Sequence, residues 1–253
     1  MLYLVGIGLA DGDISLAALE VCRRSEVYID TYTSIADERR ISYISELIGK
    51  KPSVLSRHDM EEGSAMLLKK AKDADLAVLV GGDPLTATTH KTLFIDAKKA
   101  GVSVKVIHAA SVLSAIMGES GLDFYRFGAV CTISSWSEHY KPVSFYETIA
   151  KNLSNNLHSV VLLDYDAASG SSMGIAEALR ILIEAEAHYG QKVISAKTNI
   201  IVLHNLARDG QRVVLADVSE AGRLRLNNGV TSLIVPAALT DVELESIGGM
   251  YGD

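Results

Sequence analysis

The stretch that decides the fold runs from residue 76 to residue 90 and reads Leu76-Ala-Val-Leu-Val80-Gly-Gly-Asp83-Pro84-Leu-Thr86-Ala-Thr-Thr-His90. Its first five residues are all apolar, which predicts a strand buried on both faces, as in a parallel sheet. Two glycines, an acid and a proline then end the strand. Because ligands of open α/β sheets bind beyond the carboxyl ends of strands, Asp83 is well placed to meet one. An ordinary strand-to-helix turn, with Asp83 accepting hydrogen bonds from backbone amides, is given equal weight by the spacing alone.

Strands and helices alternate on both sides of this stretch. Further apolar runs predict strands at Tyr3–Val5, Val27–Ile29 and Val104–Ile107. Such alternation is the sequence form of a mostly parallel sheet. The helices expected between the strands are one capped by Ser15, one carrying Ile41, Ile44, Leu47 and Ile48 before Gly49, and one over about Thr88 to Ala100.

The pattern changes after Gly128, where the candidate strands lie closer together. Residues 212–235 hold two strands with no obvious helix between them, so part of this second sheet is expected to be antiparallel. We therefore predict a fold of the α/β class with two domains, residues 1–112 and 113–253, and a ligand cleft between them. The candidate strands are Ala129–Ile133, Ser159–Leu163, Ile200–Leu203, Arg212–Ala216 and Ser232–Val235, and the candidate helices lie near Phe145–Leu153, Ile175–Ala187 and Thr240–Ile247.

Composition narrows the class of partner. The chain has 253 residues and a formal charge of −7, with no lysine and arginine cluster beyond short pairs such as Arg39-Arg40, which argues against a nucleic-acid or anionic membrane surface. The apolar start, Met1–Leu9, is too short for a membrane span and lacks the features of a signal peptide, so a cytoplasmic location is expected. Cys22 and Cys131 make no ligand pattern, and no metal site is expected.

Two other segments place glycines or polar groups after strands. Gly6-Ile-Gly8 resembles a dinucleotide fingerprint, but Asp11 stands where the third glycine is needed, so those glycines instead predict a close approach of a loop to a ligand or to neighbouring backbone. His108-Ala-Ala-Ser111 follows the strand at Val104–Ile107; capping of a helix by Ser111 is the favoured interpretation of that segment alone.

The remaining polar residues give weaker signals. Asp164 and Asp166 end another strand, but their alternation points them to opposite faces, which disfavours a general acid/base pair. His90, His158 and His204 stand singly, without metal-ligand spacing, and are interpreted as packing or partner contacts. No motif for covalent catalysis or phosphoryl transfer is present, and no catalytic residue is assigned.

Taken together, these segments resemble the diphthine synthases, methyltransferases of the tetrapyrrole-methylase-like group. The turn Gly82-Asp-Pro84 marks the wider group, while Thr86–His90 and Lys141-Pro-Val-Ser-Phe-Tyr146 point to the diphthine synthases within it. The resemblance covers nearly the whole chain. It also includes Leu2–Leu9, Asp30–Ser34, Val106–Ser111, Gly121–Gly128, Leu157-His158, Leu162–Asp164 and Leu233–Pro236.

The resemblance implies an activity, a cofactor and partners. It implies two α/β domains of the tetrapyrrole-methylase type, a homodimer, and S-adenosylmethionine in the interdomain cleft, leaving as S-adenosylhomocysteine. It implies as substrate the 3-amino-3-carboxypropyl group on a histidine of translation elongation factor 2, whose amino group is trimethylated to give diphthine. Two alternatives stay open: a C-methyltransferase of a tetrapyrrole such as precorrin or uroporphyrinogen, and a non-catalytic protein that binds S-adenosylmethionine.

The resemblance also implies cofactor contacts by position. Thr231 stands where the family often has a histidine, Ala10 where the wider group often has a third glycine, and residues 199–210 are divergent. Asp83 is expected to contact the cofactor rather than to act as a catalyst. The residues implied to line the cofactor are Leu9, Asp83, Thr86, Ser111 and Val112 from the first domain, and Leu163, Leu206 and Thr231 from the second.

Overall fold

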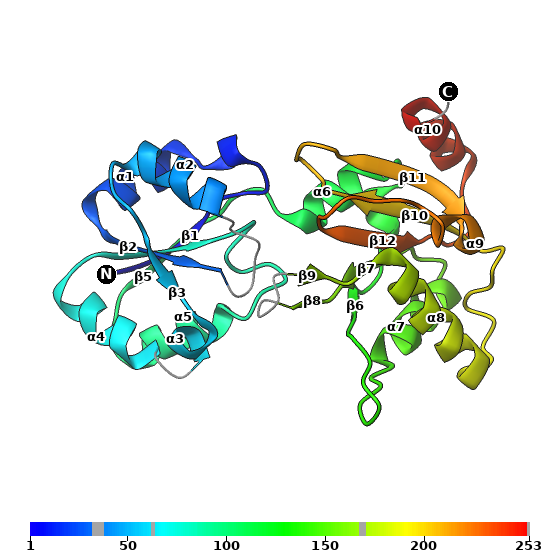
Figure 1. Ribbon diagram of the computed structural model, residues 1–253, viewed down its shortest axis with the longest axis horizontal. Helices are drawn as coiled ribbons and strands as arrows, with labels where there is room; N and C mark the ends of the chain where they lie inside the picture. Colours follow the sequence, from blue (N-terminus) through cyan, green and yellow to red (C-terminus); the bar gives the residue numbers. More distant parts are fainter. Residues whose placement is uncertain (32–37, 62–63, 167–170, 252–253) are drawn as a thin grey trace. The chain divides into compact units, whose positions relative to one another are not determined.

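The computed structural model describes residues 1–31, 38–61, 64–166 and 171–251 (Figure 1). These residues form two compact units, which are described separately: unit 1, residues 1–112, and unit 2, residues 113–166 together with 171–251. Each unit contains a five-stranded sheet. Residues 32–34 of the segment Asp30–Ser34, which contributes to the family resemblance, lie outside the described residues.

The sheet of unit 1 is wholly parallel, as the alternation of strands and helices predicts. Its strands lie in the order β3-β2-β4-β1-β5, so β4 and β1 are central neighbours. The predicted strand at residues 76–80 is confirmed with the same bounds. The strand β3 was not predicted from the sequence; it has only three residues, two of them exposed. The strands are β1 (Leu2–Gly6), β2 (Glu26–Asp30), β3 (Ser53–Leu55), β4 (Leu76–Val80) and β5 (Val104–Ile107).

Helices cover both faces of this sheet, which explains why its central strands are apolar at every position. Along β4, Leu76, Val78 and Val80 pack with buried residues of α4 and α5, whereas Ala77 and Leu79 pack with α1 and α2. The predicted cap of α1 is confirmed, because the Ser15 hydroxyl accepts a hydrogen bond from the Ala18 amide. The helices are η1 (Asp11–Asp13), α1 (Leu16–Arg24), α2 (Glu38–Ile48), α3 (Arg57–Glu61), α4 (Ser64–Asp73) and α5 (Lys91–Lys99).

The helix expected from about Thr88 begins later, at Lys91. Ala87 has a φ of +52°, which no right-handed helix accommodates, and the Thr88 hydroxyl is hydrogen-bonded to Nδ1 of His90. Residues 86–90 therefore form a turn of their own, and it lengthens the connection that follows β4.

The order of the strands creates a switch point between β1 and β4. The chain leaves β1 for α1 on one face of the sheet and leaves β4 for α5 on the other face. Because two adjacent strands send their connections to opposite faces, a crevice opens beyond their carboxyl ends, where ligands of such sheets bind. The glycine segments at residues 6–8 and 81–82 both lie at this position.

The sheet of unit 2 is mixed, in the order β11-β10-β12-β7-β6. The expected antiparallel pairing is confirmed for β10 with β11 and β12, and for β12 with β7; β6 and β7 are parallel. The expectation of no helix within residues 212–235 is wrong. The short helix α9 follows β11, and the Asp217 carboxylate caps its amino end by accepting a hydrogen bond from the Glu220 amide. The strands are β6 (Cys131–Ile133), β7 (Ser159–Leu163), β8 (Tyr165–Asp166), β9 (Ser171–Ser172), β10 (Asn199–His204), β11 (Arg212–Asp217) and β12 (Thr231–Val235).

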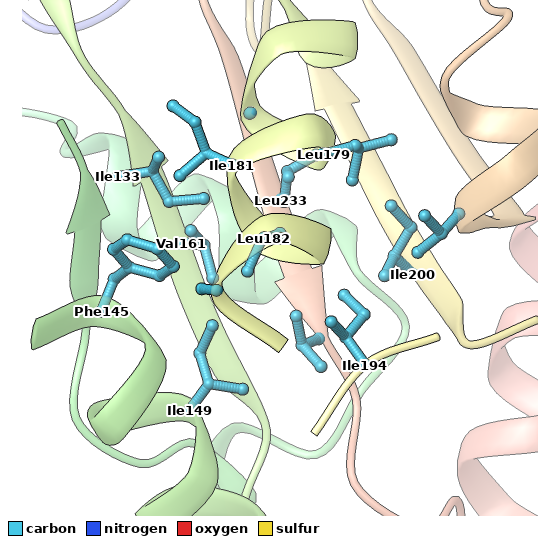
Figure 2. Close-up of a cluster of buried hydrophobic side chains, with 14 of the residues drawn as sticks. Ile133, Phe145, Ile149, Val161, Leu179, Ile181, Leu182, Ile194, Ile200 and Leu233 are labelled. Carbon is cyan, nitrogen blue, oxygen red and sulfur yellow. The ribbon is translucent and has the colours of Figure 1, made fainter. Parts of the chain in front are cut away.

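One face of this sheet supports the main core of unit 2. Figure 2 shows α8 lying over the strands, with Leu179 and Leu182 directed toward the core and Ile133, Val161 and Leu233 among the strand residues around it. Removing these side chains from water is the main source of stability for the unit. The helices are α6 (Val112–Glu119), η2 (Phe124–Arg126), α7 (Ser144–Ser154), α8 (Ile175–Tyr189), α9 (Val218–Ala221) and α10 (Asp241–Tyr251).

Candidate functional site

The loops that follow β1 and β4 are joined through their glycines. The Gly8 amide donates to the Gly82 carbonyl at 3.2 Å, and the Gly82 amide donates to the Gly8 carbonyl at 2.8 Å. The approach leaves no room for a side chain at Gly6, where a Cβ would lie 2.7 Å from the Gly82 carbonyl oxygen. The close approach expected of the first glycine segment is thus made to neighbouring backbone.

Two charged side chains hold the loop after β1: one binds its backbone carbonyls and the other binds its backbone amides. Arg40, from α2, is 4% exposed and donates to the carbonyls of Ile7, Gly8, Leu9 and Ala10 at 2.8–3.2 Å. The Asp13 carboxylate accepts hydrogen bonds from the Leu9 and Ala10 amides, each at 2.8 Å. Hydrogen bonds to charged groups are the stronger kind, so residues 7–10 are held in one conformation.

Asp83 joins the loop after β4 to the loop after β5. One oxygen accepts from the Leu85 amide and the Thr86 hydroxyl, both at 3.0 Å. The other lies 2.7 Å from Nδ1 of His108 and accepts from the Ala109 amide at 3.4 Å. Burial acts to raise the pKa of Asp83, but these hydrogen bonds outweigh it and lower that pKa below its usual value. Asp83 is therefore ionised, and its lone pairs are occupied by protein donors.

His108 differs from Asp83 in its exposure. Its side chain is 68% exposed, whereas that of Asp83 is 7% exposed. Because an ionised carboxylate can only accept hydrogen bonds, Nδ1 of His108 carries the hydrogen that is shared with Asp83. The other nitrogen, Nε2, then has a lone pair in the neutral ring. The position of His108 directly after a predicted strand indicated a place at the end of that strand, but no role for its side chain could be inferred from the sequence.

The turn at residues 86–90 is held in place by the buried pair of His90 and Asp30. Nε2 of His90 lies 3.2 Å from a carboxylate oxygen of Asp30 at the end of β2, and both side chains are fully buried. Together with the contact between Thr88 and Nδ1 of His90, this pairing gives the turn a defined position beside β4. Of the two interpretations given for His90, packing or partner contacts, its full burial supports packing.

In unit 2, three residues that the resemblance implies as cofactor contacts lie at neighbouring ends of three strands of the mixed sheet. Leu163 ends β7 and Thr231 begins β12, which runs antiparallel to β7. Leu206 follows β10, whose carboxyl end lies beside the start of β12. The Thr231 hydroxyl is 2.9 Å from Nδ1 of the buried His204, whose Nε2 is 2.7 Å from the Asn227 amide oxygen. The side chain of Thr231 thus has a partner within its own unit.

In each unit, therefore, the residues implied as cofactor contacts lie near the ends of neighbouring strands of its sheet. Leu9, Asp83 and Thr86 lie on the loops after β1 and β4, and Ser111 and Val112 follow β5. Arg40 and Asp13, which position Leu9, could not be identified from the sequence. Arg40 lies on a helix distant in sequence from the loop it holds, where an arginine is typical of a solvated surface.

Two further observations concern metal sites and membrane-spanning helices. Within the ranges that the structure describes, no cluster of three or more histidine, cysteine, aspartate or glutamate side chains could hold a metal ion. None of the helices in the described part of the chain has the length and apolar character needed to cross a lipid bilayer.

Comparison with known proteins identifies the family. Residues 1–222 match the family of Tetrapyrrole (Corrin/Porphyrin) Methylases. The chain is 38% identical to a diphthine synthase of Methanothermobacter thermautotrophicus over 100% of this chain and 96% of that one. It is 31% identical to the diphthine methyl ester synthase of Homo sapiens over 98% and 94% of the two chains.

A solved structure gives the same answer for the fold. The crystal structure of a conserved hypothetical protein from Aeropyrum pernix K1 superposes with a TM-score of 0.91 at 32% identity, covering 100% of this chain and 90% of that one. The match extends over both units, so the two proteins share the fold that contains the parallel and the mixed sheet. The chain belongs to the tetrapyrrole methylase family and, within it, to the diphthine synthases.

Proposed function

We propose that this chain transfers methyl groups from S-adenosylmethionine to the amino group of the 3-amino-3-carboxypropyl side chain on a histidine of elongation factor 2, giving diphthine. The full-length similarity to a diphthine synthase carries the choice of reaction and substrate. The switch point of unit 1, with the turn from Gly82 to Pro84, supports a small-molecule site at the carboxyl ends of β1 and β4.

The residues at that switch point fit the cofactor. A Cβ built at Gly82 would meet, among the described residues, the Ala110 carbonyl oxygen at 3.9 Å and the Leu9 side chain at 4.0 Å. The space beside Gly82 is therefore bordered by an apolar side chain and a hydrogen-bond acceptor. S-adenosylmethionine offers an apolar ring face and amino donors, which suit this pair of neighbours.

Positioning is the main task that this chemistry leaves to the protein. When bound, S-adenosylmethionine supplies a methyl group on a positively charged sulfur, which is already electrophilic. Arg40 and Asp13 fix the loop that carries Leu9, and Asp83 fixes the loops that carry Thr86 and Ser111. Rigid loops of this kind hold two reactants in a productive orientation, which by itself can contribute a large part of the rate.

The names of the relatives raise a second candidate product. The human relative is a diphthine methyl ester synthase, whereas the relative of higher identity is a diphthine synthase. An ester requires a further methyl group on the carboxylate oxygen, and the higher identity favours a product methylated only on nitrogen. We therefore propose three transfers, all to the amino nitrogen.

The experiment combines the purified chain, isotopically labelled S-adenosylmethionine and elongation factor 2 that carries the unmethylated side chain. The expected result is a gain of three methyl groups on the modified peptide, stable to mild alkali. A fourth methyl group that alkali removes would indicate the ester. The matched control is elongation factor 2 without the side chain, which should gain nothing.

Two outcomes of the same assay would point to the alternatives. Transfer to uroporphyrinogen or a precorrin, with none to elongation factor 2, would indicate a tetrapyrrole methylase. Binding of S-adenosylmethionine without transfer to any of these acceptors would indicate a binding protein. Either outcome would overturn the proposed function.

The proposal includes a homodimer and a cytoplasmic location. The dimer is supported by the resemblance to the diphthine synthases, and the location by a substrate that works in translation. Light scattering on the eluting protein tests the first, with a monomer mass as the contrary result. Fractionation of the native cells tests the second.

A further inference from the structure

His108 combines three properties that His90, His158 and His204 do not combine. It lies directly after β5, on the segment that leads to Ser111 and Val112. Its ring is 68% exposed, and its Nδ1 is 2.7 Å from the buried Asp83 carboxylate. By contrast, His90, His158 and His204 are almost fully buried, and both nitrogens of each ring lie near protein groups.

We propose that His108 is the proton acceptor for the methylated amine, held in the active tautomer by Asp83. This inference rests on the proposed function and adds to it the residue that deprotonates the nucleophile. The Asp83 carboxylate accepts a hydrogen bond from the Nδ1–H group, so the lone pair of the neutral ring is on Nε2. A carboxylate that orients a histidine in this way also stabilises the imidazolium that forms.

The need for an acceptor follows from the substrate. A primary amine is mostly protonated at neutral pH, and an ammonium group has no lone pair with which to attack. In each cycle the ammonium passes one proton to Nε2 of His108 and attacks with the freed electron pair. The new bond joins nitrogen to the methyl carbon, the bond between that carbon and sulfur breaks, and its electron pair stays on sulfur in S-adenosylhomocysteine.

The exposure of His108 suits repeated use. The methylated amine carries a positive charge again, so a proton must leave before the second and third transfers. Because the side chain of His108 is 68% exposed, water reaches the ring and offers a route for the proton to leave between cycles. After the third transfer the nitrogen has no proton left, and no acceptor is required.

The surroundings of His108 keep the ring available. Among the described contacts of its side chain, the charged neighbour is Asp83, and the residues that follow it are Ala109 and Ala110. Asp83 also accepts hydrogen bonds from the Leu85 and Ala109 amides and from the Thr86 hydroxyl. Its negative charge is therefore stabilised by groups other than His108. Loss of the imidazole should therefore leave the loops in place.

The test compares His108→Asn and His108→Ala with the unmodified chain and with His188→Asn. Asparagine keeps a donor for Asp83 but has no titrating nitrogen, and His188 is an exposed histidine on α8 of unit 2. We expect both His108 variants to bind S-adenosylmethionine with unchanged affinity by calorimetry. The first methyl transfer at pH 7 should fall by about 100-fold or more in both, and should stay unchanged in His188→Asn.

Two readouts separate a proton acceptor from a structural residue. The residual rate of His108→Asn should rise by about tenfold per pH unit, because solvent must then deprotonate the amine. Added imidazole should restore part of the rate of His108→Ala and leave His108→Asn, whose side chain fills the space, largely unchanged. A structural defect would show neither effect.

The contrary outcomes distinguish the two proposals. If the unmodified chain transfers methyl groups to elongation factor 2 and His108→Asn does so equally well at all pH values, the role of His108 is wrong and the proposed function stands. If the unmodified chain transfers no methyl group to that factor, the proposed function and the role of His108 both fail.

Discussion

Gly8 and Gly82 exchange two backbone hydrogen bonds, at 3.2 and 2.8 Å, although 73 residues of sequence separate them. Both glycines have positive φ values, +69° and +71°, which a residue with a Cβ adopts only with strain. Their surroundings differ. A Cβ at Gly8 would lie 2.1 Å from the Cβ of Asp13, whereas one at Gly82 would make only ordinary van der Waals contacts, with the Ala110 carbonyl oxygen at 3.9 Å and the Leu9 side chain at 4.0 Å.

This difference predicts two separate phenotypes. Gly8→Ala should destabilise the protein by about 3 kcal/mol or more, because backbone strain and steric overlap with Asp13 add together. Gly82→Ala should cost only the strain, about 1 to 2 kcal/mol, but should weaken S-adenosylmethionine binding by at least about tenfold, because its methyl group occupies the proposed site. Urea unfolding and calorimetry measure the two effects. Unchanged affinity in Gly82→Ala would move the cofactor away from this glycine.

Arg40 and its neighbour Arg39 provide a matched pair. Arg40→Met removes the buried donor to four loop carbonyls, and we expect a loss of about 2 kcal/mol or more in the free energy of unfolding, with weaker S-adenosylmethionine binding. Arg39 is 74% exposed and pairs with Asp11, so Arg39→Met should cost less than about 1 kcal/mol. Equal losses in the two variants would show that the clamp on residues 7–10 contributes little.

Acid should unfold unit 2 through Glu243 and His158. Burial raises the pKa of Glu243, but hydrogen bonds from the Thr240 amide, from His158 and from the Asp123 amide outweigh it and lower that pKa to about 2. Its contribution is therefore present above the ordinary pKa of 4.5 and is lost as pH falls from there toward 2. Burial lowers the pKa of His158 from 6.5, so this group too makes unfolding easier as pH falls below 6.5.

Glu243→Gln tests this acid dependence. The variant should be less stable at pH 7, because Arg126 and His158 lose a buried charged partner, and its stability should fall less steeply between pH 4.5 and 2. Glu184→Gln is the control, since Glu184 forms an exposed pair with Arg180. Urea unfolding at several pH values gives both slopes. Parallel slopes for Glu243→Gln and the unmodified chain would contradict the assignment.

Neighbouring residues on α8 test the core of unit 2. Leu182 is fully buried in the cluster of Figure 2, so Leu182→Ala should lower the free energy of unfolding by about 2 to 5 kcal/mol. Ile183 is 36% exposed, and Ile183→Ala should change the free energy of unfolding by only about 0.5 kcal/mol. Thermal or urea unfolding measures the difference, and similar losses in both would mean that α8 does not bury the face described.

The central strands could be predicted from the sequence because their burial leaves a continuous apolar run. β4 and β7 begin and end at the predicted residues, and the mixed character of the second sheet followed from the short spacing of its strands. β3 was missed because two of its three residues are exposed. The helix α4 at residues 64–73 was not predicted, since only three of its ten residues are buried, and α3 at residues 57–61 was not predicted because it is short.

The site was predictable where a strand ends and unpredictable where a distant element supports it. Asp83 and His108 both follow apolar runs, so their position at a sheet edge could be inferred. Their contact could not, because they lie 25 positions apart in the chain and the sequence does not show which distant residues meet. Arg40 was hidden for the same reason, since its partners are backbone carbonyls, which leave no mark on the sequence.

Asp83 receives its four donors from within unit 1, so the loops after β4 and β5 are held by hydrogen bonds of the protein itself. Binding there should cost little conformational entropy, so the first encounter with S-adenosylmethionine should be a simple one-step association at the rate of collision and docking. Selectivity on this side then depends on the shape of the preformed surface, and ligands too large for the space beside Gly82 are rejected at once.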